Sequence, residues 1–309
     1  MLYAKGIMSL TVACFTVAAC STASELPDSK NLPSNETSLS LNDYVLEPGA
    51  NLAFADLSQG DLSTLNLEGS ELTGADLSNA RLYRTNLSYT NLRNANLSGA
   101  DLEGANLTGA NLEGAILTGS NFTAINLNGA NLSGADLTTV FTSGGTFVGA
   151  NLSFSKIYGK QLVSVDMSNV NLTGSNIAGT NLCGSDLQGS NLTDAYLYGT
   201  FLPASNLSNA NLTNADLSEA QLMGSNMMRA NFSRANLKRA NLASPKSGDD
   251  FCGLFGISAT SLEGSNMTEA NLFEADLRGV NLKGAVLSGA NMYGAKLNGA
   301  TMPDGTIGK

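Results

Sequence analysis

The residues that could do chemistry in this chain are few and scattered. His is absent, so the side chain best suited to proton transfer at neutral pH is missing, together with the commonest transition-metal ligand. Asp249, Asp250 and Glu263 are a candidate cation site, but no ligand spacing supports it, and solvated charge explains them better. Nothing in the sequence resembles a nucleophile with its base. We therefore expect no enzyme activity, no metal and no cofactor.

The only cluster of basic side chains in the sequence lies near residue 234. Arg229, Arg234, Lys238 and Arg239 follow one another closely, and pairing of Arg239 with Glu219 would account for part of the cluster. The formal net charge of the chain is -10, which opposes non-specific binding to nucleic acid or to anionic lipid. We expect no nucleic-acid partner.

The element that must position these residues is a five-residue repeat. Every fifth position from Leu52 to Met302 is a large apolar residue, with three exceptions: Thr142, Ser247 and Cys252. A period of five fits neither a helix nor a flat strand, so each pentapeptide is expected to be a short extended piece followed by a turn. The residue two before the apolar position is mostly Ala, Ser or Thr. The residue two after it is often Gly, which tolerates the positive φ of a tight corner.

The repeated pattern A(N/D)LxG, seen in ANLSGADLEGANLTGANLEGA at residues 95–115, resembles the pentapeptide-repeat family. The resemblance covers about residues 50–302. It implies an all-β fold, a right-handed quadrilateral β-helix (β-solenoid) with four pentapeptides in each coil and about twelve to thirteen coils. We assign residues 50–309 to this solenoid.

Two segments interrupt the repeat, at residues 138–150 and near residues 243–260. Both keep the five-residue register. We expect a distorted side at the first and a projecting loop at the second. Loops on rigid scaffolds often carry function, but a neutral insertion is the simpler explanation of the second segment, and its role stays open.

The amino-terminal segment is expected to direct the chain to a membrane. Residues 1–19 have one early cation and a short apolar run, as in a signal peptide. The sequence Val-Ala-Ala-Cys that ends at Cys20 resembles the lipobox of bacterial lipoproteins, in which the Cys is diacylated. Ser21, rather than Asp, then favours the outer membrane. Residues 20–49 would be the lipidated Cys20, a flexible tether and an N-terminal cap.

Two cysteines, Cys183 and Cys252, remain in the repeat region. Cys183 follows Leu182 and is expected to point outward, whereas Cys252 lies in the second interruption, on another side and more than three coils away. That separation is about 15 Å at the spacing of paired strands, and a disulfide needs Cα atoms within about 7 Å. We therefore expect two free thiols.

One side of the solenoid is unusually regular at twenty-residue spacing. Asn recurs there, with Ser or Thr two residues on, and the next side is much less uniform. Stacked Asn amides can bond one another and stabilise the coils; alternatively, this flat uncharged face docks a partner or a polysaccharide. The candidate binding face consists of Asn171, Thr173, Asn191, Thr193, Asn211 and Thr213.

These features predict a non-enzymatic, lipid-anchored, rigid scaffold or binding protein of the bacterial cell envelope. Its expected partners are the membrane, through the lipid, and an unidentified envelope protein or polysaccharide; the oligomeric state, including a homodimer, stays open. An alternative is a surface protein that contacts ice or polysaccharide. A remote alternative is an acidic DNA mimic that binds topoisomerase, as in some members of the family, but the acidic residues here are dispersed: Asp56 and Asp76 are followed at this spacing by Asn96 and Ile116.

Overall fold

The repeat region is built from short coils that pair with one another. The structure is a computed structural model that describes residues 44–309, apart from 247, 251, 255 and 256. Within that part there is no helix and no strand longer than one bridged residue. Bridge partners are parallel and twenty residues apart, as in Asn91 with Asn111, so four pentapeptides complete one coil. The predicted signal peptide and Cys20 lie outside the described residues.

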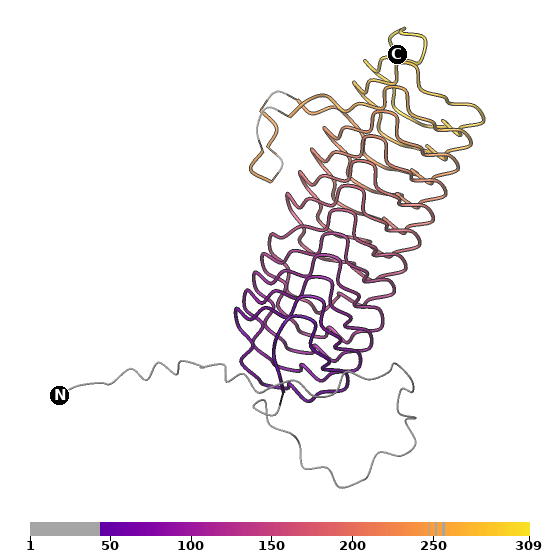
Figure 1. Cartoon of the computed structure of the whole chain (residues 1–309). Coiled ribbons are helices and arrows are strands. Elements are labelled where there is room, and N and C mark those ends of the chain that lie inside the picture. The colour runs from indigo at the N-terminus through magenta and orange to yellow at the C-terminus, as the bar shows by residue number, and fades with distance from the viewer. Residues whose placement is uncertain (1–43, 247, 251, 255–256) are drawn as a thin grey trace, which may run out of the picture. The chain divides into compact units, whose positions relative to one another are not determined.

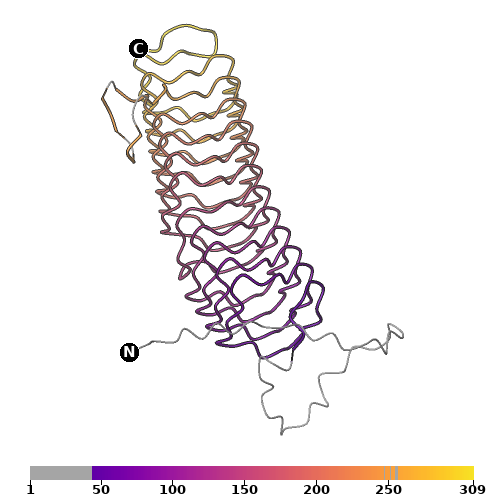
Figure 2. The same ribbon diagram turned by 60° about the vertical axis from the view of Figure 1, so that its left-hand side comes forward.

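The bridges define four sides of a column (Figures 1 and 2). The second side runs from Asp56 to Asn291, the third from Asp61 to Lys296 and the fourth from Asn66 to Thr301. The first side contains twelve bridged residues: Asn51, Glu71, Asn91, Asn111, Asn131, Asn151, Asn171, Asn191, Asn211, Asn231, Asn266 and Val286. The predicted β-helical architecture is therefore present.

Backbone hydrogen bonds join each coil to both neighbours. The amide of Leu92 donates to the carbonyl of Asn111 at 2.7 Å, and the amide of Asn91 donates to the carbonyl of Ser70 at 3.0 Å. Each corner is a tight turn, in which the amide of Ala100 donates to the carbonyl of Leu97 at 3.0 Å. Gly99 lies in that turn at a φ of 67°, which confirms the reason for the recurrent glycine.

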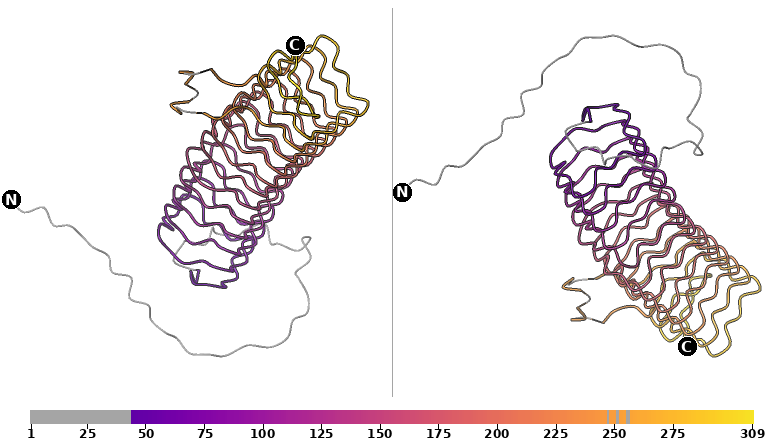
Figure 3. Two further views of the ribbon diagram at one scale, coloured as in Figure 1. Left: turned by 90° about the horizontal axis from the view of Figure 1, so that it is seen from above. Right: turned by 90° about the horizontal axis from the view of Figure 1, so that it is seen from below.

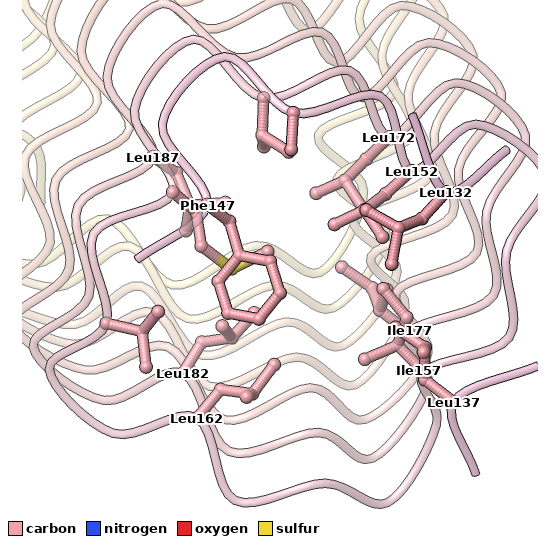
Figure 4. Close-up of a cluster of buried hydrophobic side chains, with 14 of the residues drawn as sticks. Leu132, Leu137, Phe147, Leu152, Ile157, Leu162, Leu172, Ile177, Leu182 and Leu187 are labelled. Atoms are coloured by element: carbon pink, nitrogen blue, oxygen red, sulfur yellow. The ribbon is translucent and has the colours of Figure 1, made fainter. Parts of the chain in front are cut away.

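The core is a stack of the repeated large residues, with the small residues beside them. Leu172 and Ala100 are both fully buried, and Figure 4 shows rows of Leu and Ile side chains that point into the coil interior. Where the small residue is Ser or Thr, its hydroxyl donates to a Leu carbonyl, as Thr85 does to Leu62 at 2.8 Å. Most interior hydroxyls thus have a partner close at hand, but the buried Ser265 hydroxyl has none among the described residues.

The first interruption is a distorted side, as predicted. Twenty-residue pairing continues through it, from Asn121 to Phe141. Thr142 takes the interior position and leaves a cavity of about 10 Å³, which is lined in part by Phe147 and Lys160. The Lys160 ammonium donates to the Val140 carbonyl at 2.6 Å, and burial lowers the pKa of Lys160.

The second interruption is a projecting loop, also as predicted (Figures 1 and 3, in orange). Bridge partners on either side of it are thirty-five residues apart instead of twenty, as in Asn226 with Ser261, so the loop holds fifteen extra residues. Its base is closed by hydrogen bonds, because the amide of Thr260 donates to the Ser244 hydroxyl at 3.1 Å. The coils therefore resume on the sides where they stopped.

The prediction of two free thiols is wrong. Cys183 and Cys252 form a disulfide with their Cα atoms 6.4 Å apart. The prediction placed Cys252 at the height of its own repeat, whereas the loop folds back along the column. Leu254 lies over Gly184, and Ile257 lies over Gly224. Cys183 points outward from its coil but is fully buried under the loop.

Candidate functional site

The predicted Asn ladder exists on the first side. The Asn151 amide nitrogen donates to the side-chain oxygen of Asn131 at 2.9 Å, and Asn171 donates in the same way to Asn151 at 3.0 Å. Each side-chain oxygen also accepts from the backbone two residues on, as in the 3.2 Å bond from the amide of Thr173 to Asn171. The ladder is therefore structural at least, since it bonds both neighbouring coils and the local backbone.

The six residues of the candidate binding face form one hydrogen-bonded chain. The Asn191 amide donates to the Thr173 hydroxyl at 2.9 Å, and that hydroxyl donates to Asn171 at 2.7 Å. The same relay recurs one coil on, where the Asn211 amide donates to the Thr193 hydroxyl at 2.9 Å. Each hydroxyl proton is thus directed at the Asn of its own coil, and each Asn amide at the previous coil, which leaves oxygen lone pairs and Thr methyl groups for any contact with a partner.

Asn ladders are not confined to the first side. On the fourth side, Asn86 donates to Asn66 at 2.8 Å, and Asn226 donates to Asn206 at 3.2 Å. The first side differs because Asn occupies every bridged position from Asn131 to Asn266, with an uncharged residue two positions on. The third side is also uncharged, from Asn121 to Ala243, but Phe and Gln interrupt its Asn residues. Charged groups on the first side occur only at its corner, as in Asp194 and Arg234.

The acidic trio from the sequence does not assemble into a cation site. Asp249 accepts from the amide of Lys246 at 2.7 Å within the loop. Glu263 accepts instead from the Asn281 amide at 3.0 Å. In the part of the chain that the structure describes, no group of three or more His, Cys, Asp or Glu residues could hold a metal.

The predicted partner of the basic cluster is confirmed. Arg239 lies 3.8 Å from the Glu219 carboxylate and 3.0 Å from that of Glu274. Glu274, which sequence reasoning missed, raises the pKa of Arg239 by accepting its hydrogen bond. The charge at this corner is therefore partly neutralised within the column.

Two features of the surface escaped the sequence analysis. One is the strip that the loop covers, and its signal was a run of apolar residues at outward corner positions in consecutive coils: Cys183, Pro203 and Met223. The other is a groove on the second side between Tyr158 and Tyr198. Its signal was an aromatic residue followed by Gly at the same corner, two coils apart.

The family is shown by comparison with known proteins. The model for pentapeptide repeats matches eight copies, over residues 50–88, 85–123, 105–141, 115–153, 166–202, 205–242 and 260–302. The chain belongs to the pentapeptide-repeat family, whose members fold as right-handed quadrilateral β-helices and are generally non-enzymatic structural or binding proteins. A search of curated protein sequences finds no match.

Solved structures of the same family resemble this chain. HetL, a pentapeptide repeat protein involved in heterocyst differentiation regulation in the cyanobacterium Nostoc sp., is 31% identical over 84% of this chain and 92% of HetL, with a TM-score of 0.27. QnrB1, a plasmid-mediated fluoroquinolone resistance protein, is 20% identical over 60% of this chain and 81% of its own, with a TM-score of 0.25. A thylakoid-lumen protein from Arabidopsis thaliana is 25% identical over 49% of this chain and 70% of its own, with a TM-score of 0.15.

Proposed function

We propose that this protein is a non-enzymatic, lipid-anchored scaffold of the bacterial cell envelope, whose first side docks a partner protein. The family supports a binding or scaffold role. The lipobox-like sequence at Cys20 supports the anchor and, with Ser21, an outer-membrane location. Among the described residues, no helix is long and apolar enough to cross a membrane.

The observation that carries the docking proposal is the uncharged strip of the first side between Asn131 and Thr268, because it alone among the four sides has Asn at every bridged position over this stretch of the described residues. Its Asn and hydroxyl side chains are held by one another at fixed positions, as in the relay through Thr193. A partner would meet a surface whose side chains have little conformational entropy left to lose, and such preorganisation favours binding.

The anchor is tested by the substitution Cys20→Ala. Because the thiol is the only acceptor for the lipid at the lipobox-like site, we expect the variant to lose incorporated palmitate and to leave the membrane fraction. Ser21→Thr is the matched control and should remain at the membrane. An unchanged membrane fraction for Cys20→Ala would refute the anchor.

The docking face is tested by Arg at both Thr193 and Thr213. Crosslinking and pull-down from envelope extract should recover a defined partner with the wild type and lose it with this double variant, since two cations oppose a neutral contact. Both hydroxyls serve the relay, so removing them costs about 0.5–1.5 kcal/mol for each bond. Val at both positions removes the same bonds without adding charge, so it should weaken recovery of the partner less than Arg does.

Arg at both Thr108 and Ser208, on the fourth side, is the second control. Each of these residues donates to the Asn two positions before it, as Thr193 does. If the fourth-side variant and the first-side variant retain the partner equally, the first side is only structural.

A further inference from the structure

The second side carries a groove that the ladder and the anchor do not use. It has a volume of about 500 Å³ and is lined by Tyr158, Gly159, Asn176, Ala178, Gly179, Tyr198 and Gly199. Tyr158, Ala178 and Tyr198 occupy the same corner position in three consecutive coils. Two tyrosines therefore flank an alanine, and the slot above Ala178 is open between them.

The tyrosine at one end of the groove is held in place. The Tyr198 ring stacks on Tyr196, with centroids 6.3 Å apart and planes 16° from parallel. Its hydroxyl donates to Glu219 at 2.8 Å, and this bond raises the pKa of Tyr198. Glu219 is in turn paired with Arg239. The ring is therefore positioned before any ligand arrives, although 42% of Tyr198 is exposed.

The floor and wall of the groove favour a ring-shaped polar ligand. Three glycines, Gly159, Gly179 and Gly199, form the floor, so no side chain blocks a close approach. The Asn176 oxygen accepts from the amide of Ala178 at 3.1 Å. Its amide nitrogen has no hydrogen-bond partner among the described residues, and it can donate to a ligand hydroxyl.

The length of the groove is sufficient for one sugar ring. The two tyrosine positions are two coils apart, or about 10 Å at the spacing of paired strands. A pyranose ring over Ala178 can present C–H groups to an aromatic side chain at either end of the groove, while its hydroxyls reach polar neighbours.

A peptide and an acidic polymer are less suitable occupants. The corner amides of the floor are already bonded to the next coil, as Gly179 is to the Tyr198 carbonyl at 2.9 Å, so a peptide strand cannot pair with them. None of the lining residues is charged, and the chain carries a net charge of -10, which opposes a polyanion.

We propose that the groove between Tyr158 and Tyr198 binds a neutral glycan, with one sugar ring over Ala178 and the Asn176 amide bonded to a hydroxyl. This site goes beyond the proposed scaffold function, because it lies on a different side of the column from the docking face. It requires neither the lipid nor a protein partner.

The test is direct binding of defined neutral oligosaccharides to the purified full chain, kept in a detergent that has no sugar headgroup. The probes are cellohexaose, chitohexaose, maltohexaose and laminarihexaose, with polygalacturonate as an acidic comparison. The chain has no Trp, so tyrosine fluorescence reports binding, and calorimetry supplies the affinity. We expect saturable binding of at least one neutral hexasaccharide.

Substitutions then locate the site. Tyr158→Ala and Tyr198→Ala should each weaken binding about tenfold or more, as the loss of an aromatic stacking partner predicts. Ala178→Arg should abolish binding while both tyrosines remain. Tyr89→Ala, which removes an exposed ring from the fourth side, should leave binding within about twofold. Thermal unfolding of each variant checks that the column is intact.

Failure of all four neutral hexasaccharides to bind would overturn the proposal. So would equal binding by Tyr158→Ala, Tyr198→Ala and the wild type, or preferential binding of polygalacturonate. None of these results would affect the membrane fractionation or the partner recovery that test the proposed function.

Discussion

At the scale of single residues, two adjacent glycines differ sharply in what surrounds them. Gly144 and Gly145 are neighbours in the distorted side, and both have a positive φ, of 67° and 91°. A Cβ on Gly144 would meet nothing within 4 Å, whereas one on Gly145 would lie 2.6 Å from the backbone oxygen of Ile125. Backbone atoms cannot move aside as a side chain can. Alanine at position 144 would therefore meet only the cost of a positive φ, whereas alanine at position 145 would meet that cost and a steric clash.

We predict that Gly145→Ala destabilises the protein by about 3 kcal/mol, and Gly144→Ala by only about 1 kcal/mol, the usual cost of a side chain in the left-handed region. Urea unfolding of the two variants checks this. An equal loss of unfolding free energy in the two variants would contradict this prediction. It would mean that the backbone of the distorted side shifts and relieves the clash with Ile125.

Most of the residue pattern could be predicted from the sequence. The interior position of residues such as Leu172, the small residues beside them and the corner glycines all follow from the five-residue period. The relay through Thr173 and Thr193 could not be predicted, because the spacing places a hydroxyl beside an amide without showing which group donates to which. The groove was missed because it depends on two aromatic residues forty positions apart.

At the scale of elements, the loop shows where sequence reasoning stopped. Its existence follows from the two lost apolar positions, Ser247 and Cys252. Its fifteen-residue excess does not, because Ile257 keeps the apolar pattern although it belongs to the loop. The path of the loop could not be predicted, because the five-residue pattern fixes a position along the column only for residues that belong to the coils. Leu254 and Ile257 lie on Gly184 and Gly224, where the absence of side chains leaves room for them.

We predict that the disulfide holds this loop to the column. The link between Cys183 and Cys252 spans 69 residues of sequence, and a disulfide of this span contributes about 2–4 kcal/mol. Cys252→Ser should therefore lower the urea midpoint and make the bond after Lys246 more sensitive to trypsin. The unreduced wild type is the control, and the wild type after reduction of the disulfide should change in the same direction as the variant.

Thiol titration gives the complementary measurement. Unfolded, unreduced wild-type protein should show no free thiol from Cys183 or Cys252, and reduction should release two. Detection of both thiols before reduction would contradict the disulfide and restore the original prediction.

At the scale of the whole molecule, stability is local, because each coil contacts mainly its two neighbours. Leu172 is fully buried between coils, while Leu287 belongs to the last coil and is only partly buried. We predict that Leu172→Ala costs about 2–5 kcal/mol and that Leu287→Ala costs about 1 kcal/mol.

Hydrogen exchange resolved by segment distinguishes this local behaviour from cooperative unfolding. Faster exchange should be confined to coils near the substitution, and for Leu287→Ala to the last coils. A uniform rise in exchange from residue 44 to residue 309 in either variant would show that the column unfolds as one unit.

The bridge from Asn231 to Asn266 also shows that the four sides stay aligned across the loop. In a solenoid with four sides, each pentapeptide in a coil advances the chain by one side, which is a quarter of a turn. Adding one pentapeptide therefore rotates the position of every residue after it by a quarter of a turn. The fifteen residues of the loop would amount to three such steps. Because they are held outside the winding, Asn266 stands over Asn231 and the uncharged strip continues past the insertion. Loops here can therefore vary in length without shifting the phase of the faces, whereas one pentapeptide added to a coil would bring a different face into line.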